Sequence, residues 1–201
     1  MMTNDNYALF AETITRVQAV SRQGIDRLFG ISRVEQLPKS TLFIRENKPD
    51  HYEYLLLEGI VQCGSLGGSR DPVTYMFYLP LQVLLPRLAR INAGVSTLSA
   101  ETLTACTIAK IPAADYRDFQ NSSLEIKEFS YKVLESELLK RLERERVLLT
   151  QSAQERLNGF RREFPELENL VPHPAIASYL GITPVSLSRL RRTKRPNRPA
   201  E

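Results

Sequence analysis

The sequence predicts an α+β protein in which an antiparallel β-roll is followed by one long helix and then a helix-turn-helix unit. Three observations predict this class. Short strand-like runs separated by Gly, Pro, Asn and Asp fill residues 1–120, and residues 121–149 contain neither Pro nor Gly. Within residues 150–201, a Gly separates two short helical patterns, and a basic cluster follows at once. These three ranges are the expected domains.

Composition narrows the class of protein further. The chain has 201 residues, of which 42% are hydrophobic and 25% charged, and such values exclude wholesale disorder. Two cysteines, Cys63 and Cys106, are too few for a disulfide scaffold, a zinc finger or a four-cysteine iron–sulfur site, so no cofactor is expected. The N-terminus lacks a signal-peptide pattern, and the longest apolar stretch, 73–91, contains two prolines and two arginines. A cytoplasmic protein without a membrane span is expected.

The first part of the chain is expected to begin with a helix over residues 7–20. Strands follow, as β-branched and aromatic runs bounded by turn residues. The Gly-rich segment 64–69 reads as a hairpin turn, and the Leu-rich segment 81–91 as a helical turn after Pro80. The expected strands are 41–45, 52–57, 60–63, 73–79 and a last pair within 102–111, closed by Pro112.

The second part is a single helix from about Ser122 to Gln151, roughly 40–45 Å long. Asn121, Ser122 and Ser123 are its candidate N-caps. Apolar residues recur along it at the spacing of a coiled-coil contact, so this apolar stripe packs either on its own domain or on a second copy, and we favour a homodimer. The apolar stripe consists of Tyr131, Leu134, Leu138, Leu142 and Leu149.

The third part is expected to contain helices over 153–164, 174–180 and 183–192. Thr183 is the candidate N-cap of the last one, and Pro184 occupies the first helical position, where its missing N–H costs nothing. Gly181 opens the turn between the last two helices. The pattern of small and apolar residues that packs such a pair is Ala177, Leu180, Ile182, Leu187 and Leu190.

The net charge of +4 lies entirely in this third part. Residues 1–120 carry 12 basic and 12 acidic side chains, residues 121–149 carry 6 and 6, and residues 150–201 carry 9 and 5. Six basic residues lie between Arg189 and Arg198. Such a cluster is either a solvated tail or an electrostatic footprint for nucleic acid. Because it directly follows the helix-turn-helix pattern, we favour binding to DNA.

With these features in hand, the chain resembles the Crp/Fnr family of bacterial transcription regulators over nearly its full length. The strand 104–112 with 113–116 after it looks like the end of the family's cyclic-nucleotide-binding-like roll, and 176–189 looks like its DNA-reading unit. The unit is most similar to the form in Bacteroidetes members, where the chain often stops soon after the recognition helix. The resemblance implies a homodimer joined through the long helices, with the last helix in the major groove of an imperfect palindrome. RNA polymerase is a further candidate partner.

The resemblance also implies which side chains meet double-stranded DNA. Val185, Ser186 and Arg189 match the base-reading positions, where Arg suits guanine and an apolar side chain suits a thymine methyl. Thr183 as a plain N-cap and Ser188 as a solvent-facing residue are the structural alternatives. The side chains expected to serve phosphates are Thr183, Ser188, Arg191, Arg192 and Lys194.

The resemblance fails where the family binds cyclic nucleotides. Ser96, followed by Thr97, occupies the position of the phosphate-pairing Arg, and no Gly-Glu pair occurs between residues 78 and 94. Binding of cyclic AMP is therefore not expected, and any small-molecule effector is unknown. Arg87 and Arg90 are either substitute charges for the pocket or surface side chains. No catalytic set stands out, so an enzyme is not expected; the alternative function is a ligand-binding or protein-interaction module with a vestigial helix-turn-helix.

Overall fold

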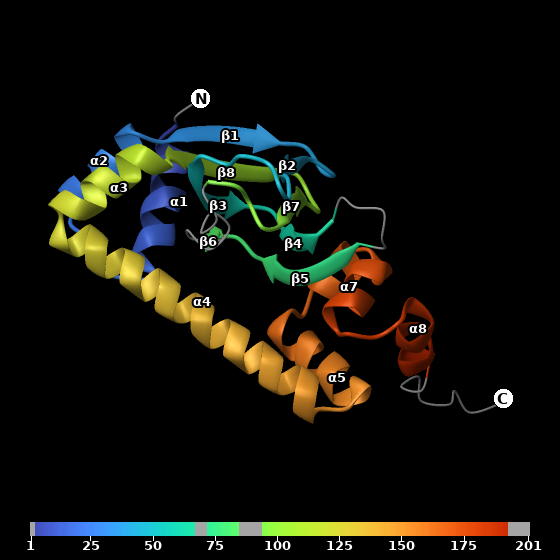
Figure 1. The fold of residues 1–201 in the computed structure, drawn as a ribbon. Coiled ribbons are helices and arrows are strands. Elements are labelled where there is room, and N and C mark those ends of the chain that lie inside the picture. The colour runs from blue at the N-terminus through green and yellow to red at the C-terminus, as the bar shows by residue number, and fades with distance from the viewer. Residues whose placement is uncertain (1–2, 67–71, 85–93, 193–201) are drawn as a thin grey trace.

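The computed structural model describes residues 3–66, 72–84 and 94–192. Two four-stranded antiparallel sheets form the N-terminal roll, so the predicted α+β class is confirmed (Figure 1). The first sheet has the strand order β1-β8-β3-β6, and the second has the order β2-β7-β4-β5. The strands are β1 (Arg33–Leu37), β2 (Leu42–Ile44), β3 (Tyr52–Glu58), β4 (Val61–Ser65), β5 (Val73–Tyr78), β6 (Gln82–Leu84), β7 (Ser99–Thr102) and β8 (Cys106–Pro112).

Strand β3 shows how the roll is filled. Successive side chains of a strand point to opposite faces of the sheet. Tyr54 and Leu56 therefore pack into the roll interior, whereas Leu55 and Leu57 pack against the helices outside. Both faces of β3 are buried, which explains why its sequence is almost continuously apolar.

Helices α1 (Asn4–Thr15), α2 (Arg22–Gly30) and α3 (Ala113–Ser122) cover the outer face of the first sheet. The helix predicted over residues 7–20 corresponds to α1, which already ends at Thr15, and a second helix that was not predicted follows it. The second begins at Ser21, whose Oγ accepts a hydrogen bond from the backbone N–H of Gly24 at 3.1 Å. This N-cap lies close behind the first helix in sequence, and the periodic pattern did not reveal it.

The helical turn predicted over residues 81–91 is wrong in its first part. Gln82–Leu84 form the edge strand β6, which pairs with β3 from Tyr54 to Leu56. Val83 packs with the outer helices and Leu84 packs in the roll interior, so two apolar layers select the strand. Residues 85–93 lie outside the described residues. So does the second half of the predicted hairpin turn, whereas Gly64 and Ser65 of its first half belong to β4, which pairs antiparallel with β5.

Helix α4 (Leu124–Thr150) confirms the predicted long helix. Its 27 residues span about 40 Å. Ser123 is extended, with φ of −134°, and separates α4 from α3. Ile126, Phe129 and Val133 bury one face of α4 against the helix-covered side of the roll. Among the described residues, no helix has the length and hydropathy that a membrane crossing requires.

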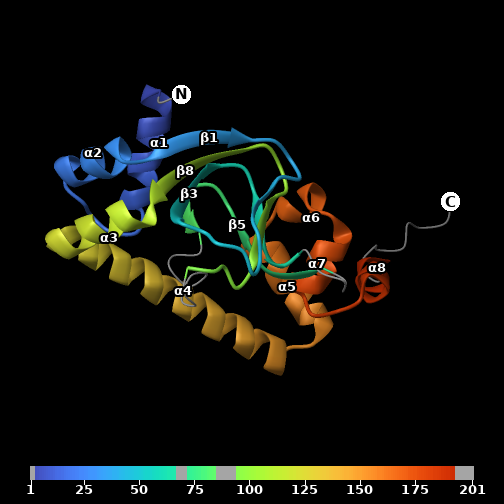
Figure 2. The same ribbon diagram turned by 45° about the horizontal axis from the view of Figure 1, so that its top comes forward.

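Four helices form the C-terminal unit, which packs directly on the roll (Figure 2). The ring of Phe77 in β5 lies 6.2 Å from that of Phe160, 6.4 Å from that of Phe164 and 5.1 Å from that of Tyr179. The backbone N–H of Thr74, also in β5, donates to Ser178 Oγ at 2.9 Å. The unit is therefore fixed to its own roll by an aromatic cluster and a hydrogen bond. Its helices are α5 (Ala153–Glu163), α6 (Leu167–Leu170), α7 (His173–Tyr179) and α8 (Pro184–Arg192).

Candidate nucleic-acid interface

The turn between α7 and α8 has the hydrogen bonds of a Schellman motif. The N–H of Gly181 donates to the carbonyl of Ser178, and the N–H of Ile182 donates to that of Ala177, each at 3.0 Å. Gly181 has φ of +65°, a left-handed conformation that glycine adopts without strain. A Cβ at this position would lie 3.1 Å from Leu148 Cδ2 of α4, so the turn also packs closely against the long helix.

Thr183 is the N-cap of α8, as predicted. Its Oγ1 accepts a hydrogen bond from the backbone N–H of Ser186 at 3.1 Å and lies 2.9 Å from Ser186 Oγ. Pro184 follows as the first helical residue. The cap satisfies one of the free N–H groups at the start of the helix and fixes the direction in which α8 leaves the turn.

One face of α8 packs on α7 and the other is exposed. Leu187 is buried, and Leu190 and Ile182 are partly buried against the same cluster, in line with the predicted packing pattern. Ser186 is half-buried. The exposed face carries the remaining predicted DNA-contacting residues of this part of the chain: Thr183, Val185, Ser188, Arg189 and Arg192. Lys194 lies outside the described residues.

The guanidinium of Arg191 is engaged within the protein. Nε donates to Glu168 Oε1 at 2.6 Å, and Nη2 donates to the Glu168 carbonyl at 3.4 Å. Nη1 lies against Nε2 of His173. Arg161 of α5 donates to both oxygens of the same carboxylate, at 2.7 and 2.9 Å. These arginine hydrogen bonds hold the pKa of Glu168 down at about 2.

Sequence reasoning missed this cluster of Glu168, Arg161 and His173. These contacts could not be predicted from sequence spacing, because the residues, with Arg191, lie in four different helices. The one available signal was local: Glu168 is an acidic residue between two basic segments of the chain. The aromatic contact between Phe77 and α5 was missed for the same reason.

The predicted apolar stripe lies on the outward face of α4. Tyr131, Leu138, Leu142 and Leu149 are exposed. Leu134 departs from this set, because it is half-buried and lines a small cavity against the first sheet. Four exposed apolar side chains on one helix face form a surface that a second chain can cover.

Two of the four predicted effector residues, Ser96 and Thr97, lie in the part of the chain that the structure describes. Ser96 is fully buried, and its Oγ donates to the carbonyl of Leu98 at 2.6 Å. Thr97 is exposed. Arg87 and Arg90 lie outside the described residues. The hydroxyl of Ser96 is thus already bonded to backbone, as expected of a structural residue and not of a phosphate ligand.

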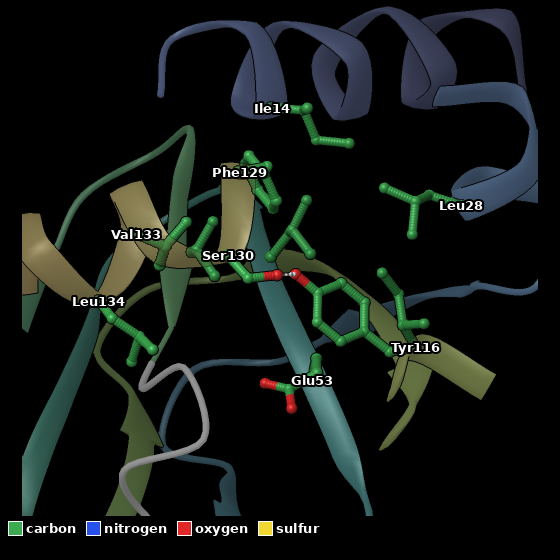
Figure 3. A pocket seen from close by; sticks show the side chains of 11 residues that line it. Ile14, Leu28, Glu53, Tyr116, Phe129, Ser130, Val133 and Leu134 are labelled. Atoms are coloured by element: carbon green, nitrogen blue, oxygen red, sulfur yellow. Dashed lines mark hydrogen bonds between the residues drawn. The ribbon is translucent and has the colours of Figure 1, made fainter. Parts of the chain in front are cut away.

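Two hollows lie elsewhere in the roll. A cavity of about 20 Å³ between α4 and the first sheet contains Glu53 and the hydrogen bond of 2.6 Å between the hydroxyls of Tyr116 and Ser130 (Figure 3). This volume holds about one water molecule. A more open hollow of about 520 Å³ lies beside His51 and Arg117 at the start of α3. Ser96 lines neither of them.

The two cysteines lie in the roll as buried residues, as predicted. Burial raises the pKa of both thiols, and nearby Glu137 adds to the effect at Cys63. Glu137 itself is a buried residue of α4, where Tyr78 Oη donates to it at 2.9 Å and Lys140 pairs with it at 3.0 Å. Among the described residues, no group of three His, Cys, Asp or Glu side chains could hold a metal ion.

This fold, with a roll, a long helix and a capped helix-turn-helix in this order, is similar to solved structures of transcription regulators, one of them assigned to the Crp/Fnr family. FixK2 from Bradyrhizobium japonicum has a similar structure, with a TM-score of 0.69 and 18% identity over 81% of this chain and 84% of that chain. The c-di-GMP responsive global regulator CLP from Xanthomonas campestris has a TM-score of 0.68 and 16% identity, over 86% of this chain and 91% of that chain. A protein from Eubacterium rectale assigned to the Crp/Fnr regulators has a TM-score of 0.70 and 14% identity, over 87% of this chain and 83% of that chain. In sequence, the chain matches no protein-family model and no curated protein.

Proposed function

We propose that this protein is a cytoplasmic, homodimeric transcription regulator that binds a specific DNA sequence through α8. The observation that carries this proposal is the exposed polar and basic face of α8, on a helix capped by Thr183 and packed on α7 through Leu187. A rigid helix with one buried and one exposed face suits the major groove. The likeness in fold to transcription regulators supports the same function.

The proposed DNA-contacting side chains fall into two groups according to the part of the DNA that each can reach. Arg189 lies one turn into α8, and Val185 and Ser186 lie nearer its start, where a recognition helix meets base edges. The side chains that reach the DNA backbone bind phosphates and thereby fix the position of the protein along the duplex. In this proposal the phosphate residues are Thr183, Ser188, Arg192 and Lys194.

The proposed dimer forms through the apolar stripe of α4. A two-fold axis along this helix pairs two copies of α8, whose half-sites are then about 34 Å apart on an imperfect palindrome. An effector has no assigned pocket, and cyclic AMP is not a candidate because Ser96 is bonded to backbone. RNA polymerase is the further partner that this function implies.

In vitro selection of the binding sequence, followed by mobility shift at moderate salt, tests the proposal. We expect one preferred palindrome. Arg189→Ala should cost about 1–3 kcal/mol per half-site on it and relax the preference at one base position. Lys194→Ala, the matched control, should weaken specific and non-specific DNA alike and make the salt dependence shallower. No specific complex with any duplex would instead indicate a ligand-binding or protein-interaction module. Equal weakening of all sequences by Arg189→Ala would move Arg189 to the phosphate contacts.

A further inference from the structure

We infer that Glu168 is a positioning residue for the recognition helix, and that it holds Arg191 inside the protein as an anchor of α8 and not as a phosphate ligand. The inference rests on the proposed DNA-binding function and deepens it. It assigns opposite roles to Arg191 and Arg192, which are adjacent in sequence and identical in type.

The contacts of Arg191 are those of an anchor. Its guanidinium meets three groups at once: the Glu168 carboxylate at 2.6 Å, the Glu168 carbonyl at 3.4 Å and the His173 ring. Its side chain is 22% exposed, and that of Glu168 is 15% exposed. Arg192, by contrast, lies on the exposed face of α8. A planar guanidinium held by several acceptors is a far more directional contact than a point charge.

The charges explain why a phosphate would not capture Arg191. Glu168 accepts hydrogen bonds from Arg161 of α5 and from Arg191 of α8, so one carboxylate separates two guanidinium groups. Moving Arg191 onto DNA would break its contacts with Glu168 and His173 and expose a part-buried side chain. The very low pKa of Glu168 shows that the carboxylate is ionised at any pH at which the protein would bind DNA.

The anchor acts on the last turn of α8. Thr183 caps the first turn of α8, and the buried side chain of Leu187 packs the middle of this helix against the core. Arg191 then ties the last turn to α6 through Glu168 and to α7 through His173. Base contacts tolerate little displacement, so a helix fixed at both ends favours specific over non-specific binding.

Fluorescence anisotropy on the selected operator and on a scrambled duplex, over a series of salt concentrations, tests the inference. The variants are Glu168→Gln and Arg191→Lys, with Arg192→Lys and Arg192→Ala as matched controls. Glu168→Gln and Arg191→Lys should each lose about fivefold to tenfold in operator affinity, with little change on the scrambled duplex and an unchanged salt slope. Arg192→Lys should bind nearly as wild type, since Lys also serves phosphates, and Arg192→Ala should reduce the slope by about one per lost contact.

Arg191 is a phosphate ligand if Arg191→Lys binds like wild type, or if Glu168→Gln tightens binding to both duplexes; either result overturns the inference. Circular dichroism confirms that each variant is folded. If Glu168→Gln does not fold, the operator affinity of Arg191→Lys compared with that of Arg192→Lys still tests the inference. A wild-type protein that binds no duplex refutes the proposed function itself, and this result is distinct from a change among variants of a protein that does bind.

Discussion

Leu138→Asp should convert the proposed dimer into monomers. Leu138 is 58% exposed on the single chain, so a partner helix can remove about half of its surface from water. Full burial of a leucine is worth about 1.5–3 kcal/mol, which gives about 1–1.5 kcal/mol for each copy and about 2–3 kcal/mol for the two copies in a dimer. The variant loses this contribution and in addition places a carboxylate on each side of an apolar contact, at several kcal/mol per charge.

The total of about 4 kcal/mol or more corresponds to a dimer Kd raised by about a factor of 1,000. Sedimentation velocity over a range of protein concentrations measures this directly. Leu139→Asp is the matched control, because Leu139 is 61% exposed and adjacent but is rotated by about 100° around the helix from Leu138. It should leave the dimer nearly unchanged. A Leu138→Asp protein that stays dimeric at low micromolar concentration refutes the assignment of the apolar stripe to the interface.

Three other predictions concern the effector, the contact between the domains, and pH. Isothermal titration with millimolar cyclic AMP or cyclic GMP should show no saturable heat, because the hydroxyl of Ser96 is bonded to backbone; a Kd in the low micromolar range would contradict this. Phe77→Ala removes the ring that meets Phe160 and Tyr179, and should lower the free energy of unfolding in urea by about 3–5 kcal/mol; a loss under 1 kcal/mol would mean that the rings carry little of the contact. The folded-state pKa of Glu168 is depressed to about 2 from an ordinary value of 4.5, so its contribution is present above about pH 4.5 and is lost as the pH falls towards 2. Because its side chain is partly hydrated, we expect about 1–3 kcal/mol, seen as a stability difference between wild type and Glu168→Gln that disappears with acidification. A difference that stays constant from pH 6 to pH 3 would exclude this source of stability.

The long helix and the helix-turn-helix could be predicted because their signals are local. The helical spacing of apolar residues and the absence of Pro and Gly predict α4 from neighbouring residues alone, and the structure has this helix. The Thr183-Pro184 pair likewise predicts the start of α8, where Thr183 is the N-cap. The roll was predicted as a class from its short strands. Its sheet order was not, since pairing such as that of β1 with β8 joins segments far apart in the chain.

The failures have physical causes of the same kind. Val83 and Leu84 are apolar and fit a helix or a strand equally well, and only the two apolar layers that they meet in the folded protein select a strand. Leu134 has the spacing of the apolar stripe but sits at its edge, where the first sheet half-covers it. For Arg191, the resemblance to the family implies a phosphate contact, whereas Glu168, its neighbour in space, supplies an internal partner. Charge counts identify the basic region and do not show which of its members are already paired.

The contact of Phe77 with α5 and α7 has a mechanical consequence. Because β5 is hydrogen-bonded to α7 through Thr74 and Ser178, the DNA-reading unit is an extension of the roll and has no free hinge in the described structure. In the proposed dimer each protomer then moves as one rigid body about the apolar stripe of α4, and α8 moves with it. A small rotation of one protomer against the other displaces α8 by an amount proportional to its distance from the α4 contact. The operators that such a dimer can read are therefore limited by the stiffness of the α4 pair, and a ligand anywhere on the roll that tilts this pair would change the distance between the two half-sites.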